Sequence, residues 1–317
     1  MRIMVVFTGG TIGSFEKEGD VISPGGEGYN RQLLARYADS GMAIPGVDFD
    51  TMEPLTTLSE NMTVDKWNRL IAALRELDLT AYAGVIVTHG TDTLAYTAAL
   101  LSLLWQGMPK PLWLVSAGKT LSQPDSNGLP NFAQAVEGIA SGTPGVWVAW
   151  KTSRGEQRTI PGYALRQCDL YTDEMSGYEG AAPPSQPDTP RLYTLAQPLK
   201  PAVLCIRPYP GIDYAAFQPG PAVKAVLHET YHAGTAPTQG DSTILSFATR
   251  CREQGIAVYT APLKPDMPVY QSEAEMARAG IRPLPGVTFE MAYARLVVAY
   301  SQGDAAAGEA LLSDFAQ

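Results

Sequence analysis

The sequence has little of several features that mark whole classes of protein. Its 317 residues include three cysteines, Cys168, Cys205 and Cys251, without a CxxC spacing. This argues against a disulfide framework or a cysteine zinc site and is compatible with a reducing cytoplasm. Lysine and arginine form no cluster, and the net charge is −9 at pH 7. We therefore expect no nucleic-acid partner.

Long hydrophobic runs are also missing. No apolar stretch approaches the roughly 18–20 residues that a membrane span needs. The N-terminus enters a strand-like run at once, without the apolar region and cleavage site of a signal peptide. We therefore expect no membrane partner and a cytoplasmic location. The hydrophobic content of 45% is ample for a large core, and the length favours two domains over one.

Short apolar runs alternate with amphipathic stretches in the first half of the chain. The runs have the composition of strands buried on both faces, and the stretches have helical spacing. Strands are predicted at 2–7, 84–89, 111–117 and 145–150, and helices at 62–77, 93–107 and 131–142. This alternation predicts a doubly wound, mostly parallel sheet.

A proline-rich stretch, 176–202, then interrupts the pattern. Smaller units follow, with predicted strands at 202–211, 224–231 and 256–262 and predicted helices at 242–255, 288–303 and 305–316. The expected architecture is α/β, with a larger N-terminal domain (1–185), a linker (186–199) and a smaller C-terminal α/β domain (200–317).

The first predicted strand runs into "TGGTIGS", residues 8–14. A glycine-rich turn after a strand can cradle a phosphate, but this one is neither GxGxxG nor GxxxxGK[ST], and the following segment is charged and glycine-rich. A flexible flap after the strand fits better. An ordinary turn, with glycine for backbone freedom and threonine as a cap, remains open.

The second predicted strand ends in "THGTDT", residues 88–93. Hydroxyls and a carboxylate at the carboxyl end of a parallel strand stand where open α/β sheets bind ligands. Thr91 or Asp92 could simply cap the next helix, but three polar side chains exceed what one cap requires.

"HETYH", His228 to His232, matches the HExxH pattern of zinc hydrolases. That chemistry depends on a helix that places both histidines on one face. Here the motif follows "KAVL", which is typical of a strand, and His89 is the only other histidine. We therefore expect a packing or hydrogen-bonding role, and no metal or other cofactor.

Together the two loops resemble the asparaginase family of amidohydrolases, whose signatures are TGGTI near the N-terminus and HGTDT about eighty residues later. Thr8 to Ile12 and His89 to Thr93 match both at that spacing. The resemblance implies a hydrolase of two α/β domains that acts on a small amino acid. It also implies active sites at an intimate dimer interface, within a homodimer or homotetramer.

The resemblance also implies catalytic roles. Thr11 would be the primary nucleophile or its positioner, and Thr91 the second catalytic hydroxyl. Asp92 would hold the α-ammonium of the substrate. Backbone N–H groups around Gly90 and Thr91 would polarise the scissile amide.

Further substrate contacts follow from the same resemblance. Ser59 would hold the α-carboxylate, and Glu60 falls where the family often has Gln or Ser. Glu273, from a second copy of the chain, would contact the ammonium group. Its match to the family rests mainly on its spacing to Gly280.

Two proton-handling groups of the family have no match. The family lysine, in a TK step, corresponds to Ile160 here. Lys151 lies nearby and is a candidate substitute, and Lys119 stands where the family usually shows Arg. The flap tyrosine of many members falls at Asp20-Val21.

We therefore expect an asparaginase-like amidohydrolase that converts L-asparagine to L-aspartate and ammonia by threonine-dependent acyl transfer. The alternatives are a divergent member acting on another amide or ester, or a weakly catalytic amino-acid-binding protein.

Overall fold

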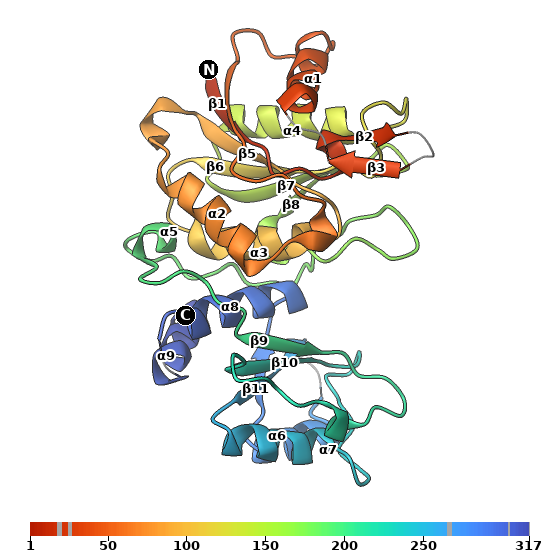
Figure 1. Cartoon of the computed structure of the whole chain (residues 1–317), viewed down its shortest axis with the longest axis vertical. Coiled ribbons are helices and arrows are strands. Elements are labelled where there is room, and N and C mark those ends of the chain that lie inside the picture. Colours follow the sequence, from red (N-terminus) through yellow and green to blue (C-terminus); the bar gives the residue numbers. More distant parts are fainter. Residues whose placement is uncertain (18–20, 25–26, 265–267, 304, 317) are drawn as a thin grey trace. The chain divides into compact units, whose positions relative to one another are not determined.

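The computed structural model describes residues 1–17, 21–24, 27–264, 268–303 and 305–316. Contacts divide the chain into two compact units. Unit 1 comprises Met1–Gly177 and Gln186–Thr194, and unit 2 comprises Tyr178–Ser185 and Leu195–Gln317. Each unit is an α/β structure built on its own sheet (Figure 1).

The sheet of unit 1 has six strands in the order β4-β1-β5-β6-β7-β8. Only β8, at one edge, is antiparallel to its neighbour. The strands are β1 (Arg2–Val6), β4 (Asp48–Met52), β5 (Gly84–Thr88), β6 (Pro111–Val115), β7 (Gly145–Lys151) and β8 (Gln157–Pro161). A separate antiparallel hairpin, β2 (Ser14–Lys17) and β3 (Val21–Pro24), follows β1.

Helices cover both faces of this sheet. Figure 1 shows α1 and α4 on one face and α2 and α3 on the other. The helices of the unit are α1 (Glu27–Ala38), α2 (Val64–Arg75), α3 (Leu94–Leu104), α4 (Gly128–Ser141) and the single turn α5 (Arg191–Thr194). Ten of the eleven residues of α3 are buried, as is typical of a helix that is apolar on all sides.

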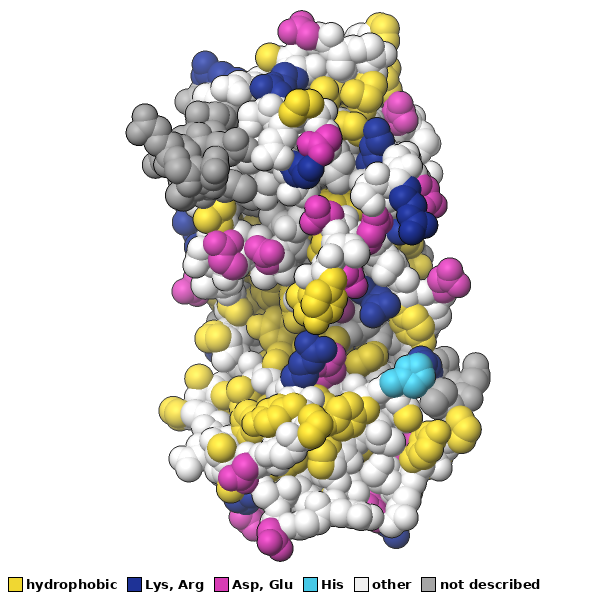
Figure 2. All heavy atoms as spheres, turned by 90° about the vertical axis from the view of Figure 1, so that its right-hand side faces the viewer, with side chains coloured by type: hydrophobic (Ala, Val, Ile, Leu, Met, Phe, Trp, Pro, Cys, Tyr) yellow, Lys and Arg dark blue, Asp and Glu magenta, His cyan; other side chains and the backbone are white. Residues whose placement is uncertain are grey.

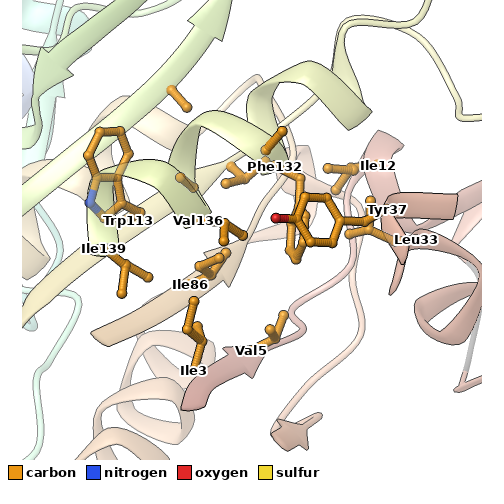
Figure 3. Close-up of a cluster of buried hydrophobic side chains, with 14 of the residues drawn as sticks. Ile3, Val5, Ile12, Leu33, Tyr37, Ile86, Trp113, Phe132, Val136 and Ile139 are labelled. Carbon is orange, nitrogen blue, oxygen red and sulfur yellow. The ribbon is translucent and has the colours of Figure 1, made fainter. Parts of the chain in front are cut away.

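The core beneath α1 and α4 is built from alternate residues of the central strands. Ile3, Val5 and Ile86 point to this face and pack against Phe132 and Val136 of α4 (Figure 3). Strand residues of the opposite parity, such as Val85 and Leu112, are also 0% exposed. Burial on both faces explains why these strands are continuous apolar runs.

The loops after β1 and β5 emerge where the chain changes direction across the sheet. After β1 the chain passes through α1 to β4, on one side of β1. After β5 it passes through α3 to β6, on the opposite side and over the opposite face (Figure 1). Adjacent strands whose connections diverge in this way leave a crevice at their carboxyl ends, which is where open α/β sheets bind ligands.

Unit 2 has a parallel four-stranded sheet in the order β12-β11-β10-β9. Its core includes Val226 and Val258 from the sheet and Phe247 from α6. The strands are β9 (Val203–Ile206), β10 (Ala225–Glu229), β11 (Ala257–Leu263) and β12 (Arg282–Pro285). The helices are α6 (Ile244–Glu253), α7 (Gln271–Arg278), α8 (Phe289–Ser301) and α9 (Ala305–Ala316).

The predicted α/β class, with a larger doubly wound, mostly parallel sheet and a smaller second sheet, is confirmed. The buried strands are also confirmed to within two residues in unit 1. Strands β4 and β8 and helix α1 were not predicted. The helix predicted at 62–77 is shorter in the structure, where α2 begins after the Thr63 cap and ends at Arg75.

The surface carries charges of both signs. In Figure 2, acidic and basic side chains are interspersed over the visible face and do not gather in a large patch of one sign. Among the residues that the structure describes, no helix has the length and apolar character needed to cross a membrane.

Candidate active site

The two signature loops touch through their glycines. Gly10 has a φ of 83°, and a Cβ atom placed on it would lie 2.3 Å from the backbone nitrogen of Gly90. Gly9 has a φ of 98°, and a Cβ atom placed on it would lie 2.3 Å from the Thr57 carbonyl oxygen. Both positions combine a left-handed backbone with a contact that excludes a side chain. Thr11 and Thr91 each follow a glycine of this contact.

Thr11 begins a single 3₁₀ turn, Thr11–Gly13, at the carboxyl end of β1. The loop is held by Thr8, whose hydroxyl donates to the Thr88 carbonyl at 2.6 Å, and by Ser14, whose hydroxyl donates to the Gly10 carbonyl at 2.7 Å. Thr11 itself is half-buried. The loop is therefore fixed by its neighbours, and no hydrogen bond joins the Thr11 hydroxyl to another described residue.

Ser59 and Asp92 are in direct contact, although they follow different strands. The Ser59 hydroxyl donates to Asp92 Oδ2 at 2.8 Å and accepts from the Asp92 backbone N–H at 3.2 Å. Thr93 Oγ1 donates to the Ser59 carbonyl at 2.9 Å. Gly90 permits this approach, since a Cβ atom on it would lie 2.5 Å from Ser59 Oγ.

His89 is buried beneath the same loop at 0% exposure. Its Nδ1 lies 2.8 Å from the Gly90 carbonyl oxygen, and its Nε2 lies 2.9 Å from Thr97 Oγ1. Burial lowers the pKa of His89 to about 4 from an ordinary value of 6.5. The imidazole is therefore neutral at pH 7 and forms part of the loop's framework.

Comparison with known proteins assigns the family. The family profile described as "Asparaginase, N-terminal" matches residues 2–163, the part of the chain that holds both loops. The chain belongs to the asparaginase family.

Relatives of this asparaginase-family chain resemble it over most of its length. It is 26% identical over 314 residues to an L-asparaginase of Thermococcus kodakarensis, covering 94% of this chain and 92% of the relative. It is 23% identical over 270 residues to one of the subunits of the glutamyl-tRNA(Gln) amidotransferase of Methanococcus vannielii, covering 77% of this chain and 62% of that protein.

A solved structure has the same fold as this chain. The thermostable L-asparaginase from Thermococcus kodakarensis matches with a TM-score of 0.76 at 23% identity, covering 100% of this chain and 97% of that one. The predicted family and the predicted class of enzyme, an asparaginase-type amidohydrolase, are confirmed.

In this asparaginase-family chain, the position that the resemblance gives to the family lysine is occupied by a buried isoleucine. Ile160 pairs with Val148 in the antiparallel edge strand β8 and is 5% exposed. An isoleucine side chain neither accepts nor donates a proton. It fills an apolar site in the sheet and cannot take the role that the resemblance gives to a lysine.

Lys151 stands at the end of β7, two strands from β5. Strand spacing of about 4.8 Å puts about 10 Å between these two strands. Trp147 and Ala149 belong to the core beneath α4, so alternation places Lys151 on that face. Thr91 leads into α3 on the other face, and a role for Lys151 in activating it stays a prediction.

The segment after β8 carries polar groups beside the loop after β6, which the sequence did not indicate. The Cys168 thiol has its pKa raised to about 11, by burial first, then by Asp173 and Asp169, with a smaller effect of Asp92. A Cβ atom on Gly118, just beyond β6, would lie 3.6 Å from the Asp173 carboxyl carbon. The segment therefore lies beside the loop after β6, and Cys168 is a neutral thiol at pH 7 rather than a nucleophilic thiolate.

The remaining predicted residues are a chain neighbour of Ser59, a lysine in the loop after β6, a carboxylate in unit 2 and the flap position. Glu60 is exposed in the 3₁₀ turn Ser59–Asn61, and Lys119 forms an ion pair with Asp125. Glu273 lies in the first turn of α7 in unit 2, with its Oε2 buried and unpaired among described groups. The flap position Asp20 and the side chain of Val21 are outside the described residues.

The HETYH segment begins on a strand, as predicted, since His228 and Glu229 are the last two residues of β10 and the rest lies in the following loop. His228 is 0% exposed, and its Nε2 lies 2.9 Å from the Tyr214 hydroxyl. His232 is exposed in the following loop. Within the described part of the chain, no three His, Cys, Asp or Glu side chains are grouped to hold a metal ion.

The two buried histidines predict a loss of stability in mild acid. Burial lowers the pKa of both His89 and His228 to about 4 from 6.5. An unfolded chain protonates them below about pH 6.5, whereas each folded unit resists until about pH 4. The free energy of unfolding should therefore be greatest above pH 6.5 and fall by up to about 1.4 kcal/mol per pH unit for each histidine.

Urea titrations between pH 7.5 and 5 measure this effect above the range in which carboxylates titrate. A free energy of unfolding that stays constant from pH 7.5 to 5 would contradict the neutral, buried state of both rings.

Proposed function

We propose that this protein hydrolyses the side-chain amide of L-asparagine to L-aspartate and ammonia by threonine-dependent acyl transfer. The supporting observation is the glycine contact between the loops after β1 and β5, which brings two threonine-bearing turns together at the crevice of the sheet. A carboxylate and a hydroxyl, Asp92 and Ser59, adjoin the same contact. This set of groups can bind an amino acid and attack its side chain.

In the proposed reaction, the hydroxyl oxygen of Thr11 attacks the amide carbon and forms a C–O bond. The C–N bond then breaks, and the nitrogen takes a proton and leaves as ammonia. Water attacks the resulting ester, which releases L-aspartate and restores the hydroxyl. Thr91 supplies the second hydroxyl, and a group that accepts the nucleophile's proton is required because a threonine hydroxyl is a weak nucleophile. Lys151 is proposed to accept the proton of Thr91, in place of the family's lysine.

Substrate binding would replace the hydrogen bond between Ser59 and Asp92 with hydrogen bonds from each residue to the substrate. In the structure the Ser59 hydroxyl donates to Asp92. An arriving α-ammonium group would take over the Asp92 carboxylate with a stronger, charge-assisted bond. The Ser59 hydroxyl would then be released to donate to the α-carboxylate, with Glu60 beside it.

We also propose that the chain assembles with further copies of itself. Glu273 of the partner subunit would contact the α-ammonium group in a homodimer or homotetramer. The buried, unpaired Oε2 of Glu273 supports a partner for this carboxylate outside the described residues. We place the enzyme in the cytoplasm, in keeping with its scattered cysteines.

One observation favours a second candidate function. Ile160 is a buried apolar residue at the position that the family resemblance gives to a lysine. A site without that lysine suits an easier leaving group than an amide nitrogen. The second candidate is therefore hydrolysis of another amide or an ester of a small amino acid, or binding of the amino acid with little turnover.

Ammonia release from the purified full chain separates these functions. We expect turnover of L-asparagine to exceed that of D-asparagine and L-glutamine, and to persist in excess chelator. Hydrolysis of the β-methyl ester of L-aspartate without release of ammonia from any amide would favour the second candidate. Activity that disappears with chelator and returns with zinc would contradict both.

A further inference from the structure

A chain of buried polar side chains connects helix α2 to the Gly90 carbonyl. Trp67 Nε1 on α2 donates to Thr97 Oγ1 on α3 at 2.9 Å, and the same oxygen lies 2.9 Å from His89 Nε2. His89 Nδ1 then meets the Gly90 carbonyl oxygen at 2.8 Å. These three side chains, the Trp67–Thr97–His89 chain, are at most 4% exposed. None of them has a part in the acyl transfer described above.

Only one arrangement of protons satisfies this chain. A carbonyl oxygen can only accept, so His89 must carry its proton on Nδ1. His89 Nε2 is then an acceptor, and the Thr97 hydroxyl donates to it. Thr97 Oγ1 in turn receives the indole N–H of Trp67, which can only donate. Each hydrogen bond therefore fixes the direction of the next.

The end of this chain determines the orientation of one peptide group. In a trans peptide, the carbonyl and the following N–H point to opposite sides. Because the Gly90 carbonyl is turned toward buried His89, the N–H of Thr91 is turned away from the core. No described group accepts a hydrogen bond from this N–H. The close contacts of Gly90 with Gly10 and Ser59 leave the peptide little room to rotate.

We propose that Trp67, Thr97 and His89 are positioning residues that hold the Thr91 N–H toward the carbonyl oxygen of the scissile amide. This inference rests on the proposed function. Negative charge develops on that oxygen as a threonine attacks, so a fixed N–H stabilises the transition state more than the bound substrate. Loss of the positioning should therefore lower kcat and leave KM almost unchanged.

Variants at Thr97 test the chain with matched shapes. Thr97→Val removes both hydrogen bonds but keeps the branched side chain, and Thr97→Ser keeps the hydroxyl. We expect Thr97→Val to lower kcat by about tenfold to a hundredfold, somewhat less than the loss of a whole oxyanion donor, with KM within about twofold. Thr97→Ser should recover most of the loss, and Trp67→Phe should resemble Thr97→Val. Equal kcat values for the wild type, Thr97→Val and Trp67→Phe would overturn the proposal.

A second measurement needs no substrate. The ¹⁵N chemical shifts of His89 at pH 7 report which ring nitrogen carries the proton, and we expect Nδ1 in the wild type and in Thr97→Ser. Thr97→Val should shift the proton partly or wholly to Nε2. A wild-type proton on Nε2 would overturn the positioning chain. If the protein hydrolyses no amide but shows the expected shifts, the proposed function fails while the orientation of the peptide by His89 is supported.

Discussion

Thr91→Val is expected to reduce amide hydrolysis by at least about a thousandfold in kcat, the scale seen when a catalytic hydroxyl is removed from an acyl-transfer enzyme. Thr91 follows the Gly90–Gly10 contact at the carboxyl end of β5. Valine keeps the branched shape and removes only the hydroxyl. Since that hydroxyl bonds to no described residue, the free energy of unfolding should stay within about 0.5 kcal/mol of the wild type.

The measurement is ammonia release from L-asparagine, with Thr91→Ser as the matched control that keeps a hydroxyl. Thr91→Ser should retain most of the activity. The parallel variant Thr11→Val should lose as much as Thr91→Val if both hydroxyls act on the substrate. Wild-type rates in both valine variants would contradict the threonine mechanism, whatever the rate of the serine variant.

Gly10→Ala is expected to destabilise unit 1 by more than about 3 kcal/mol or to prevent folding. A Cβ atom at this position would lie 2.3 Å from Gly90 N and 2.4 Å from the His89 carbonyl carbon. Both are backbone atoms that cannot move without separating the two signature loops. The backbone of Gly10, with a φ of 83° and a ψ of 175°, lies in a region essentially restricted to glycine and adds about 1–3 kcal/mol of conformational strain for any residue with a side chain.

Gly46→Ala provides the control for this effect. Gly46 has a similar φ of 74°, but no atom lies within 4 Å of the position of its Cβ. It should therefore lose only the strain of about 1–2 kcal/mol and keep its activity. Urea unfolding of the two variants compares them directly. Equal losses in both would mean that the loops can separate at little cost and that the contact does not define the site.

The sequence predicted the centre of the sheet well, because buried parallel strands are continuous apolar runs. Strands β4 and β8 escaped the prediction because both lie at sheet edges, where one side has no partner strand and polar residues are tolerated. In β4, "DFDTM", no residue is fully buried. In β8, "QRTIP", only Ile160 is buried. Neither pattern differs from that of a loop.

The two signature loops were predictable from their motifs, TGGTI and HGTDT, which resemble those of the asparaginase family. Contacts between loops were not. The Ser59–Asp92 bond joins residues 33 positions apart in the chain, and its formation depends on the order of β4, β1 and β5 in the sheet. Trp67 reads as one member of an apolar helical stripe, and only its distance to Thr97 reveals the indole N–H as a donor.

The most direct test is a crystal structure of the full chain with L-aspartate bound. We expect aspartate in the crevice between the loops after β1 and β5, with its α-ammonium on Asp92 and its side-chain carboxyl carbon about 3–3.5 Å from the hydroxyl of Thr11 or Thr91. Aspartate bound only elsewhere, or held there with its side chain turned away from both threonines, would contradict the proposed active site.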